Sequence, residues 1–203
     1  YLGCCRSHDE SVKRIVDQLK ASGLYENTLI VYTSDDGCHF MTRNLEYKRS
    51  CHEGSTHIPL IVSGGAYKDM GRTDRLVSLI DLPPTLLTAA GIDVPENFDG
   101  IALQSGTERD CVFAQISESH NGRCVITEKY TYSISSGLNY STDKYRDDYL
   151  YDREKDRGER HNLINSPAYA KEKEKLRGLL VREMLKAGES APVIKRRLFK
   201  GNI

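Results

Sequence analysis

Two adjacent carboxylates and a group of basic side chains share one short stretch of this sequence. Asp35 and Asp36 directly follow an apolar, β-branched run at residues 28–33. Adjacent carboxylates repel each other unless a positive charge lies beside them, and their oxygens are hard ligands that suit Ca²⁺ or Mg²⁺. An acidic pair followed by cations therefore indicates a divalent metal ion and an anion that share one site. The basic residues that follow are His39, Arg43, Lys48, Arg49, His52 and His57.

Two apolar runs, residues 28–33 and 59–62, flank this stretch. Strands that are apolar on both faces are typical of a mostly parallel sheet covered by helices, so the predicted fold class is α/β. Such sheets bind ligands at the carboxyl ends of their strands, which is where the loop of residues 34–58 begins. A connection of this length without regular structure is typically functional.

Each of these residues also has a structural interpretation. Asp36 before Gly37 could form a turn with its own backbone, and Lys48 could be a solvated loop lysine. Cys38 and Cys51 flank the proposed site, but no second thiolate stands at the spacing of a zinc finger, so we do not expect zinc. Most of the cysteines are expected to be small buried apolar residues.

The pattern Ser-Asp-Asp-Gly at 34–37, then Lys48, then Glu53-Gly54 and Pro59, resembles the metal-binding and lysine motifs of the type I sulfatases. These enzymes are members of the alkaline-phosphatase-like superfamily. The resemblance extends over nearly the whole chain in the family's order. The other segments that look like the family are residues 1–23, 76–91, 117–132 and 149–163.

The resemblance implies roles for individual residues. It places Asp35 and Asp36 in the metal site and Lys48 in contact with the sulfate. The family has Asn or His where Asp36 stands, and a second carboxylate favours Ca²⁺ (or Mg²⁺) over zinc. His39 is a candidate substrate contact, and His52 is a candidate substrate contact or proton donor to the leaving group. Both histidines could equally be packing residues.

Three further candidates follow a predicted strand at residues 111–116. In the sulfatases this region approaches the substrate, so Ser119, His120 and Arg123 are candidate contacts to sugar or sulfate. They could equally be turn residues. His57 stands where the family commonly has arginine, and its role is left open.

The family's nucleophile motif, Cys-x-Pro-x-Arg or Ser-x-Pro-x-Arg, does not occur in the 203 residues. In the sulfatases its first residue becomes formylglycine, and two more metal carboxylates come from the same N-terminal part. The chain thus resembles the C-terminal portion of a sulfatase, and we expect no turnover by it alone. Its expected partners are the missing N-terminal half of the same protein and a sulfated small molecule or glycan.

Two other functions are compatible with these residues. One is a phosphatase or phosphodiesterase of the same superfamily, which would use zinc and a hydroxyl nucleophile. The other is a non-catalytic half-domain that binds sulfated glycans.

Local patterns predict the elements that position these residues. A capping box at residues 7–10 predicts a helix that Gly23 ends. Residues 76–80 read as a strand, followed by a helix that Asp81 caps. The Ser166-Pro167 pair predicts the start of a last helix, whose buried stripe includes Leu176, Leu179, Leu180 and Met184.

These elements suggest three consecutive regions. Residues 1–120 would be part of the sulfatase α/β domain, 121–190 a C-terminal subdomain with a small antiparallel sheet and a packed helix, and 191–203 a tail. The 29 basic and 29 acidic residues balance, so no nucleic-acid partner is expected. No apolar run approaches the ~20 residues of a membrane span, so none is expected.

Overall fold

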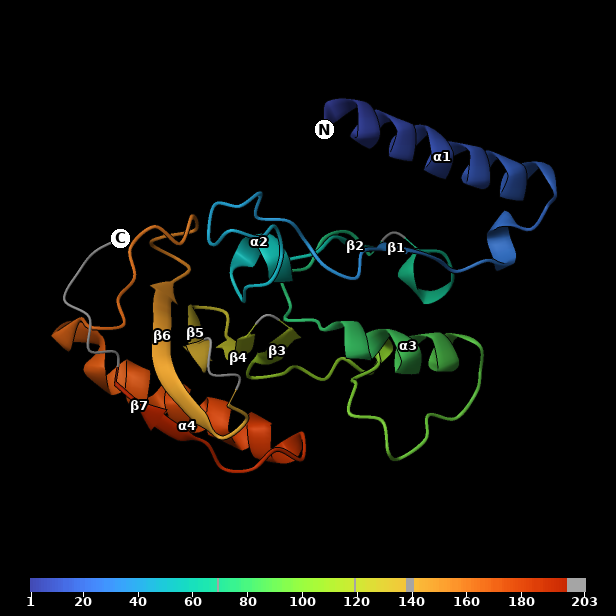
Figure 1. Cartoon of the computed structure of the whole chain (residues 1–203). Coiled ribbons are helices and arrows are strands. Elements are labelled where there is room, and N and C mark those ends of the chain that lie inside the picture. The colour runs from blue at the N-terminus through green and yellow to red at the C-terminus, as the bar shows by residue number, and fades with distance from the viewer. Residues whose placement is uncertain (69, 119, 138–140, 197–203) are drawn as a thin grey trace. The chain divides into compact units, whose positions relative to one another are not determined.

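The computed structural model describes residues 1–68, 70–118, 120–137 and 141–196. Its contacts divide the chain into two units, whose elements are labelled in Figure 1. The first unit consists of residues 1–34, 59–74 and 79–107, and the second of residues 35–58, 75–78 and 108–203. Each unit is described by itself.

The first unit contains helices and a two-stranded sheet. Strand β1 (Ile30–Thr33) pairs antiparallel with β2 (Leu60–Ser63), with Ile30 opposite Ser63. The α/β class is confirmed, but these two strands pair antiparallel and not in parallel as we expected, because apolar composition favours a strand direction without fixing it. Nor are they buried on both faces, since Ile61 is 61% exposed.

Helix α1 (Leu2–Ala21) begins earlier than the capping box predicted. Tyr1 occupies the N-cap position, and Ser7 lies inside the helix, where its carbonyl accepts a hydrogen bond from the Ser11 hydroxyl. Charged pairs four residues apart, such as Arg6 with Glu10, support the added turn. The predicted C-terminus is confirmed, because Gly23 adopts a φ of +69° that favours glycine.

Helix α3 (Leu82–Ala89) follows a 3-10 turn, Leu79–Asp81, and not the predicted strand at 76–80. The prolines at the start of α3 fix the backbone of the first helical turn, and the residues before them form the 3-10 turn. Asp81 stands at the N-cap position as predicted, but its carboxylate accepts a hydrogen bond from the Ile101 amide at 2.7 Å. Its role is structural. The unit's other 3-10 turns are Tyr25–Asn27, Gly65–Tyr67 and Leu103–Ser105.

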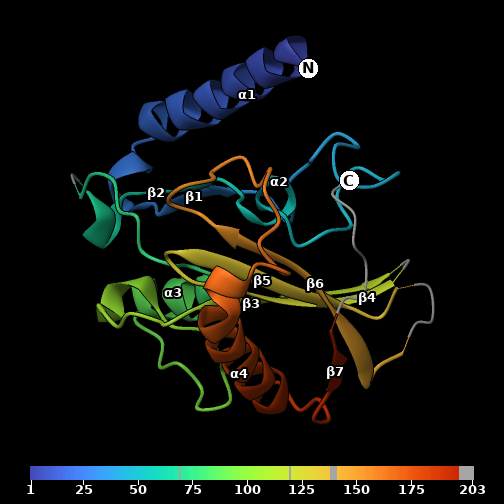
Figure 2. The ribbon, with the colours of Figure 1, turned by 90° about the vertical axis from the view of Figure 1, so that its left-hand side faces the viewer.

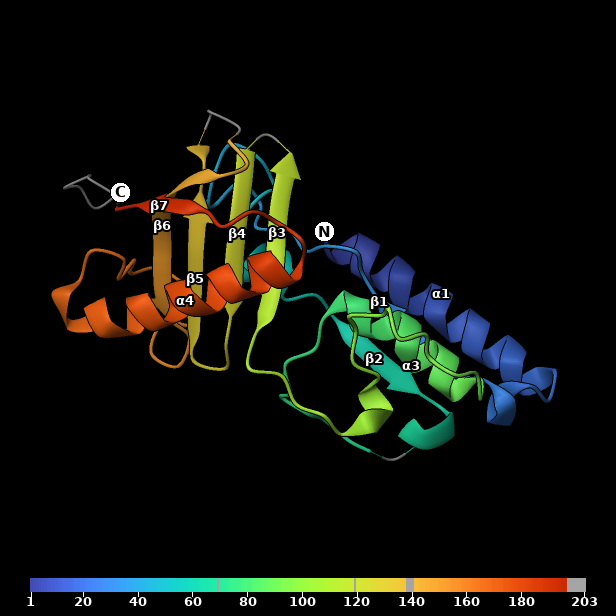
Figure 3. The same cartoon turned by 90° about the horizontal axis from the view of Figure 1, so that it is seen from below.

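The second unit is built on a five-stranded sheet in the order β3-β4-β5-β6-β7. The first four strands are antiparallel neighbours, and β7 runs parallel to β6. Helix α4 crosses one face of this sheet (Figure 3). The short helix α2 lies on the opposite side (Figure 2). The elements are α2 (Glu53–Thr56), β3 (Val112–Glu118), β4 (His120–Ile126), β5 (Tyr130–Ser135), β6 (Lys144–Asp152), the 3-10 turn Pro167–Tyr169, α4 (Ala170–Lys186) and β7 (Val193–Lys195).

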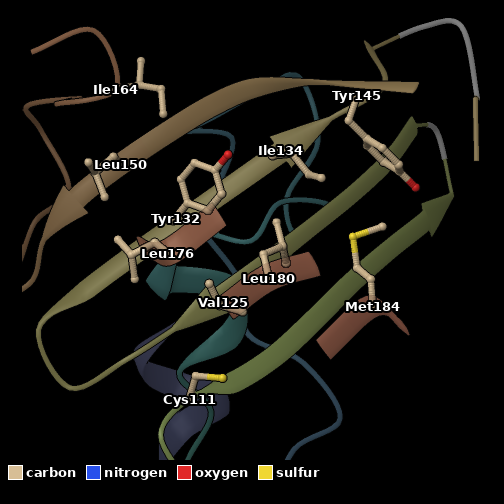
Figure 4. Packing of buried hydrophobic residues seen from close by; sticks show 10 residues of the cluster. All are labelled: Cys111, Val125, Tyr132, Ile134, Tyr145, Leu150, Ile164, Leu176, Leu180 and Met184. Atoms are coloured by element: carbon tan, nitrogen blue, oxygen red, sulfur yellow. The ribbon is translucent and has the colours of Figure 1, made fainter. Parts of the chain in front are cut away.

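The face under α4 carries the larger core (Figure 4). Leu176, Leu180 and Met184 of α4 are buried against the sheet, which confirms the predicted stripe. A buried carboxylate, Asp147, accepts hydrogen bonds in this layer from the Tyr132 hydroxyl at 2.7 Å and from Arg177 at 2.9 Å. These hydrogen bonds connect α4 to β5 and β6.

The predicted boundary after residue 120 stays a prediction about domain organisation. In the contact pattern, β3 already belongs to the C-terminal sheet through its pairing with β4. Within the described ranges, no helix combines the length and the apolar character needed to cross a membrane.

Leu180→Ala should lower the free energy of unfolding of the second unit by ~3 kcal/mol, because it leaves a cavity under the sheet. Leu180 is 0% exposed, whereas Leu185 on the same helix is 51% exposed. Leu185→Ala is therefore the matched control and should change stability by less than about 0.5 kcal/mol. Urea unfolding measures both, and equal losses would contradict the packing described.

Candidate functional site

The loop of residues 35–58 is folded back on itself by close backbone contacts. The Gly37 amide donates a hydrogen bond to the Ser55 carbonyl at 2.9 Å, and a Cβ atom at Gly37 would lie 2.2 Å from the Gly54 carbonyl oxygen. Only glycine fits at this crossing. The crossing holds α2 beside the segment that carries Asp35 and Asp36.

Within this loop, Lys48 forms an ion pair with Asp36. The hydrogen bond from its Nζ to the Asp36 carboxylate raises the pKa of Lys48, and the charge of Asp35 acts in the same direction. Both side chains of the pair are about one third exposed, at 32% and 36%. The residues predicted to hold the metal and the sulfate thus lie together at the surface of one loop.

The donor chemistry of this site fits a hard divalent cation in part. Asp35 and Asp36 offer carboxylate oxygens, the ligand type that Ca²⁺ and Mg²⁺ bind. Ca²⁺ binds six to eight oxygen atoms, so these two residues would supply only part of its coordination shell. In the described part of the chain, no group of three or more His, Cys, Asp or Glu side chains is arranged to hold a metal ion.

His52 lies in a buried aromatic cluster. Its ring stacks on Tyr149 with centroids 4.2 Å apart, and its Nε2 lies 3.4 Å from the Tyr151 hydroxyl. Burial lowers the pKa of His52 to about 3, helped by the charge of Arg43. His52 is therefore neutral at pH 7, an environment that does not favour the predicted donation of a proton from imidazolium. Its role stays a prediction.

His39 lies in the same loop and is only 5% exposed. Neither ring nitrogen has a hydrogen-bond partner among the described residues. Burial lowers the pKa of His39, as it does for His52. A buried imidazole with both nitrogens unpaired is costly. Its contact with substrate stays a prediction.

A β-bulge brings the two tyrosines to this cluster. In the β5–β6 pairing, Ser133 lies opposite Tyr149 while Ile134 lies opposite Asp147, so Asp148 is unmatched. The extra residue reverses the alternation of β6, and Tyr149 and Tyr151 point away from α4. Sequence alternation across β6 contains no signal for this change.

The candidates after β3 fall in different places. Ser119 lies outside the described residues. His120 projects from β4 on the face that the loop covers, as does Cys124. Arg123 projects from the other face, where it is 6% exposed and donates hydrogen bonds to Glu189 at 2.7 Å and to the Ile116 carbonyl at 2.8 Å. The structure therefore separates Arg123 from Lys48 and His52, and its predicted substrate contact stays untested.

Sequence reasoning missed two contacts between the loop and the turn that carries Gly158 and Glu159. Arg43 donates hydrogen bonds to the carbonyls of Gly158 and Glu159, both at 2.6 Å. The Glu159 carboxylate accepts from the Glu53 amide at 2.9 Å. These partners are more than 100 residues apart in sequence, and no local pattern signals the contact.

Comparisons with known proteins agree with this architecture. The family model described as Sulfatase matches residues 1–92. Arylsulfatase K of Xenopus laevis is 38% identical over 103 residues, which are 51% of this chain and 19% of that protein. A solved 2-O GAG sulfatase has a TM-score of 0.78 at 27% identity, covering 88% of this chain and 41% of its own. A phosphonate monoester hydrolase from Silicibacter pomeroyi shares the fold, with a TM-score of 0.75 at 21% identity, covering 88% of this chain and 38% of its own.

The fold and these matches define the class as an α/β protein of the alkaline-phosphatase-like type. Within that class, residues 1–92 match the sulfatase family model, and the chain is similar to arylsulfatases. It spans about one fifth of the length of the curated relative, 19%, and 41% of the solved sulfatase.

The buried cysteines should resist modification in the folded protein. Cys4 and Cys5 are exposed and should react promptly with a maleimide at neutral pH. Cys51 and Cys124 are buried, and their mutual hydrogen bond together with burial raises the pKa of the Cys124 thiol, so both should react only after unfolding. Peptide mass spectrometry reads each site, and prompt labelling of Cys124 would contradict the packing.

The neutral state of His52 should contribute to acid sensitivity. The unfolded imidazole binds a proton below about pH 6.5, whereas the folded one does so only near its pKa of about 3, so stability is lost as the pH falls. Between pH 7 and pH 5 this loss should be about 2 kcal/mol. His52→Phe keeps a ring against Tyr149 and should remove that part of the loss in urea unfolding. An equal loss in both proteins would contradict the buried, neutral state.

Proposed function

We propose that this chain supplies part of the active site of a sulfatase that hydrolyses sulfate esters with a divalent metal ion. The observation that carries the proposal is the contact between Lys48 and Asp36, which joins the family's two motifs in one place. The family membership of residues 1–92 supports it. For the whole protein, the activity is sulfuric ester hydrolysis.

Lys48 would contact the sulfate oxygens. Its pKa is raised, so its ammonium stays charged at neutral pH and can neutralise the charge that develops on the transferred group or the leaving oxygen. Asp35 and Asp36 would hold the metal ion, Ca²⁺ or Mg²⁺. When bound, such an ion withdraws charge from the sulfate oxygens. His39, His52 and His120 project from the loop and from the sheet face that it covers, and are the candidate substrate contacts.

The nucleophile must come from polypeptide outside the 203 residues, because they contain no Cys-x-Pro-x-Arg or Ser-x-Pro-x-Arg motif. A formylglycine in that segment, in its hydrated form, would supply the hydroxyl for displacement at sulfur, with the S–O bond to the alcohol breaking and the alcohol leaving. The chain alone then lacks both the nucleophile and the remaining metal carboxylates. It would be inactive until it is joined with that segment.

The substrate class we propose is a sulfated glycan or a smaller sulfated molecule. Support comes from the similarity to a solved 2-O GAG sulfatase at 27% identity. The contacts that choose among sulfated substrates would come from both parts of the protein.

The second candidate function is hydrolysis of a phosphate ester or phosphonate. It is favoured by the shared fold of the phosphonate monoester hydrolase, at a TM-score of 0.75. The donor set argues against a zinc-dependent phosphatase, because a second carboxylate at Asp36 suits a hard cation better than zinc. A non-catalytic half-domain that binds sulfated glycans would use the same lysine without a nucleophile.

The first test compares the 203-residue chain with the same chain extended by the coding sequence upstream of Tyr1. The isolated chain should not hydrolyse an aryl sulfate. If the extension contains the nucleophile motif, the longer protein should hydrolyse aryl sulfate faster than aryl phosphate. Lys48→Ala in it should lower kcat/KM by ~10²–10³-fold, the usual effect of removing one charge-stabilising group.

Lys68→Ala is the matched control, because Lys68 is an exposed lysine paired with Glu26. It should leave the rate unchanged. Sustained hydrolysis by the isolated chain, above its own Lys48→Ala variant, would refute the need for a second segment. Equal activity of the longer protein with and without Lys48 would refute the role of this lysine.

A further inference from the structure

Glu159 is an unusual residue for its position. It follows β6 in a turn and has a φ of +50°, a region that non-glycine residues seldom occupy. Its side chain is only 2% exposed, and its Oε1 has no hydrogen-bond partner among the described residues. A buried carboxylate in a strained turn is expensive, so the surrounding structure must compensate for it.

The compensating contacts come from the loop of residues 35–58. The Glu159 Oε2 accepts a hydrogen bond from the Glu53 amide at 2.9 Å and lies 3.7 Å from the Arg43 guanidinium. Arg43 also donates to the carbonyls of Gly158 and Glu159, both at 2.6 Å. The turn that carries Gly158 and Glu159 therefore contacts the loop of residues 35–58 at two separate points, Arg43 and the Glu53 amide.

Arg43 and Glu53, which make these contacts, each stand within five residues of Lys48 in the sequence. Glu53 opens α2 and is five residues beyond Lys48 in the sequence. From α2, Ser55 accepts the hydrogen bond of the Gly37 amide, next to Asp36. Two hydrogen bonds and the short backbone of α2 thus connect Glu159 to the segment that carries Asp36.

We infer that Glu159 is a positioning residue, which together with Arg43 holds the loop of residues 35–58, and with it Lys48, on the C-terminal sheet. The coupling itself is a property of this chain. Its consequence for sulfate binding rests on the proposed function of Lys48.

The charge state of Glu159 makes this coupling measurable. Burial raises the pKa of Glu159 to about 7, and the charge of Glu53 acts in the same direction. The Glu53 amide, Arg43 and Arg153 act in the opposite direction. When the loop opens, the carboxyl regains its ordinary pKa of 4.5, so opening releases a proton and becomes easier as the pH rises toward 7. Tyr151 and Cys124 are further titratable groups near Glu159 among the described residues.

The two buried histidines of the loop titrate in the opposite sense. His39 and His52 gain protons on opening below about pH 6.5, which favours opening in acid. A comparison of the wild type with Glu159→Gln cancels this contribution, because both proteins keep both histidines. Glutamine also keeps a carbonyl that can accept from the Glu53 amide.

The experiment is amide hydrogen exchange of the 203-residue chain, followed by NMR from pH 5 to pH 8. The quantity of interest is the protection factor of the Glu53 and Gly37 amides in the wild type divided by that in Glu159→Gln. We expect this ratio to fall by ~50-fold as the pH rises and to become level above about pH 7. The amide of Leu180 in α4, far from this turn in the sequence, should show a constant ratio.

Two variants serve as controls. Glu154→Gln changes an exposed glutamate of the same turn, which pairs with Lys129, and should reproduce the wild-type profile. Arg43→Lys keeps the charge but loses the paired donation to the two carbonyls. It should lower the protection of the loop amides at every pH, which tests the coupling even if Glu159→Gln does not fold.

Two results would overturn the inference. One is a ratio that does not change with pH. The other is an equal change in the α4 amides, which would mean that Glu159 stabilises the unit as a whole. The readout needs no turnover, so it is independent of the proposed function. A pH-dependent ratio, together with a longer protein whose rate does not change in Lys48→Ala, would refute only the proposed function. A constant ratio in an active enzyme would refute only the coupling.

Discussion

The fold of the second unit depends on the packing of other segments against both faces of its sheet. α4 covers one face with a regular apolar stripe, and the loop of residues 35–58 covers the other. The large apolar side chains of that loop, Phe40, Met41, Leu45 and Tyr47, are exposed. Its burial therefore relies on the stack of His52 on Tyr149 and on Cys51 against Cys124. A functional loop is thereby also part of a core.

This double role has an electrostatic cost. His39, His52 and Glu159 are all buried. Burial lowers the pKa of the two histidines and raises that of Glu159, so it favours the neutral form of each group. Proteins retain such groups where hydrogen bonds or function compensate for them. Here Arg43 supplies hydrogen bonds to backbone carbonyls, while the pair of Lys48 and Asp36 is half-buried at the surface of the loop.

Local sequence signals succeeded where one element determines its own end. Gly23 ends α1 through its positive φ, and Ser166-Pro167 precedes α4 by a single 3-10 turn. Local signals gave a wrong prediction where neighbouring residues favour a different structure. The capping box at residues 7–10 is a real local pattern, yet ion pairs along the helix extend it to Leu2. Residues 76–80 have strand composition, but the prolines that follow favour a tight turn.

The sequence by itself determined the resemblance to the sulfatases, the α/β class and the short-range order of the Asp-Asp-Gly and lysine motifs, because these depend on residue types at fixed spacing. Only the tertiary structure decided which distant polar residues share a face. The bulge at Asp148 turns Tyr149 toward His52, and strand alternation places Arg123 on the opposite side. Glu159 meets Glu53 across 106 positions of sequence, a contact that depends on the path of the whole chain and leaves no local pattern.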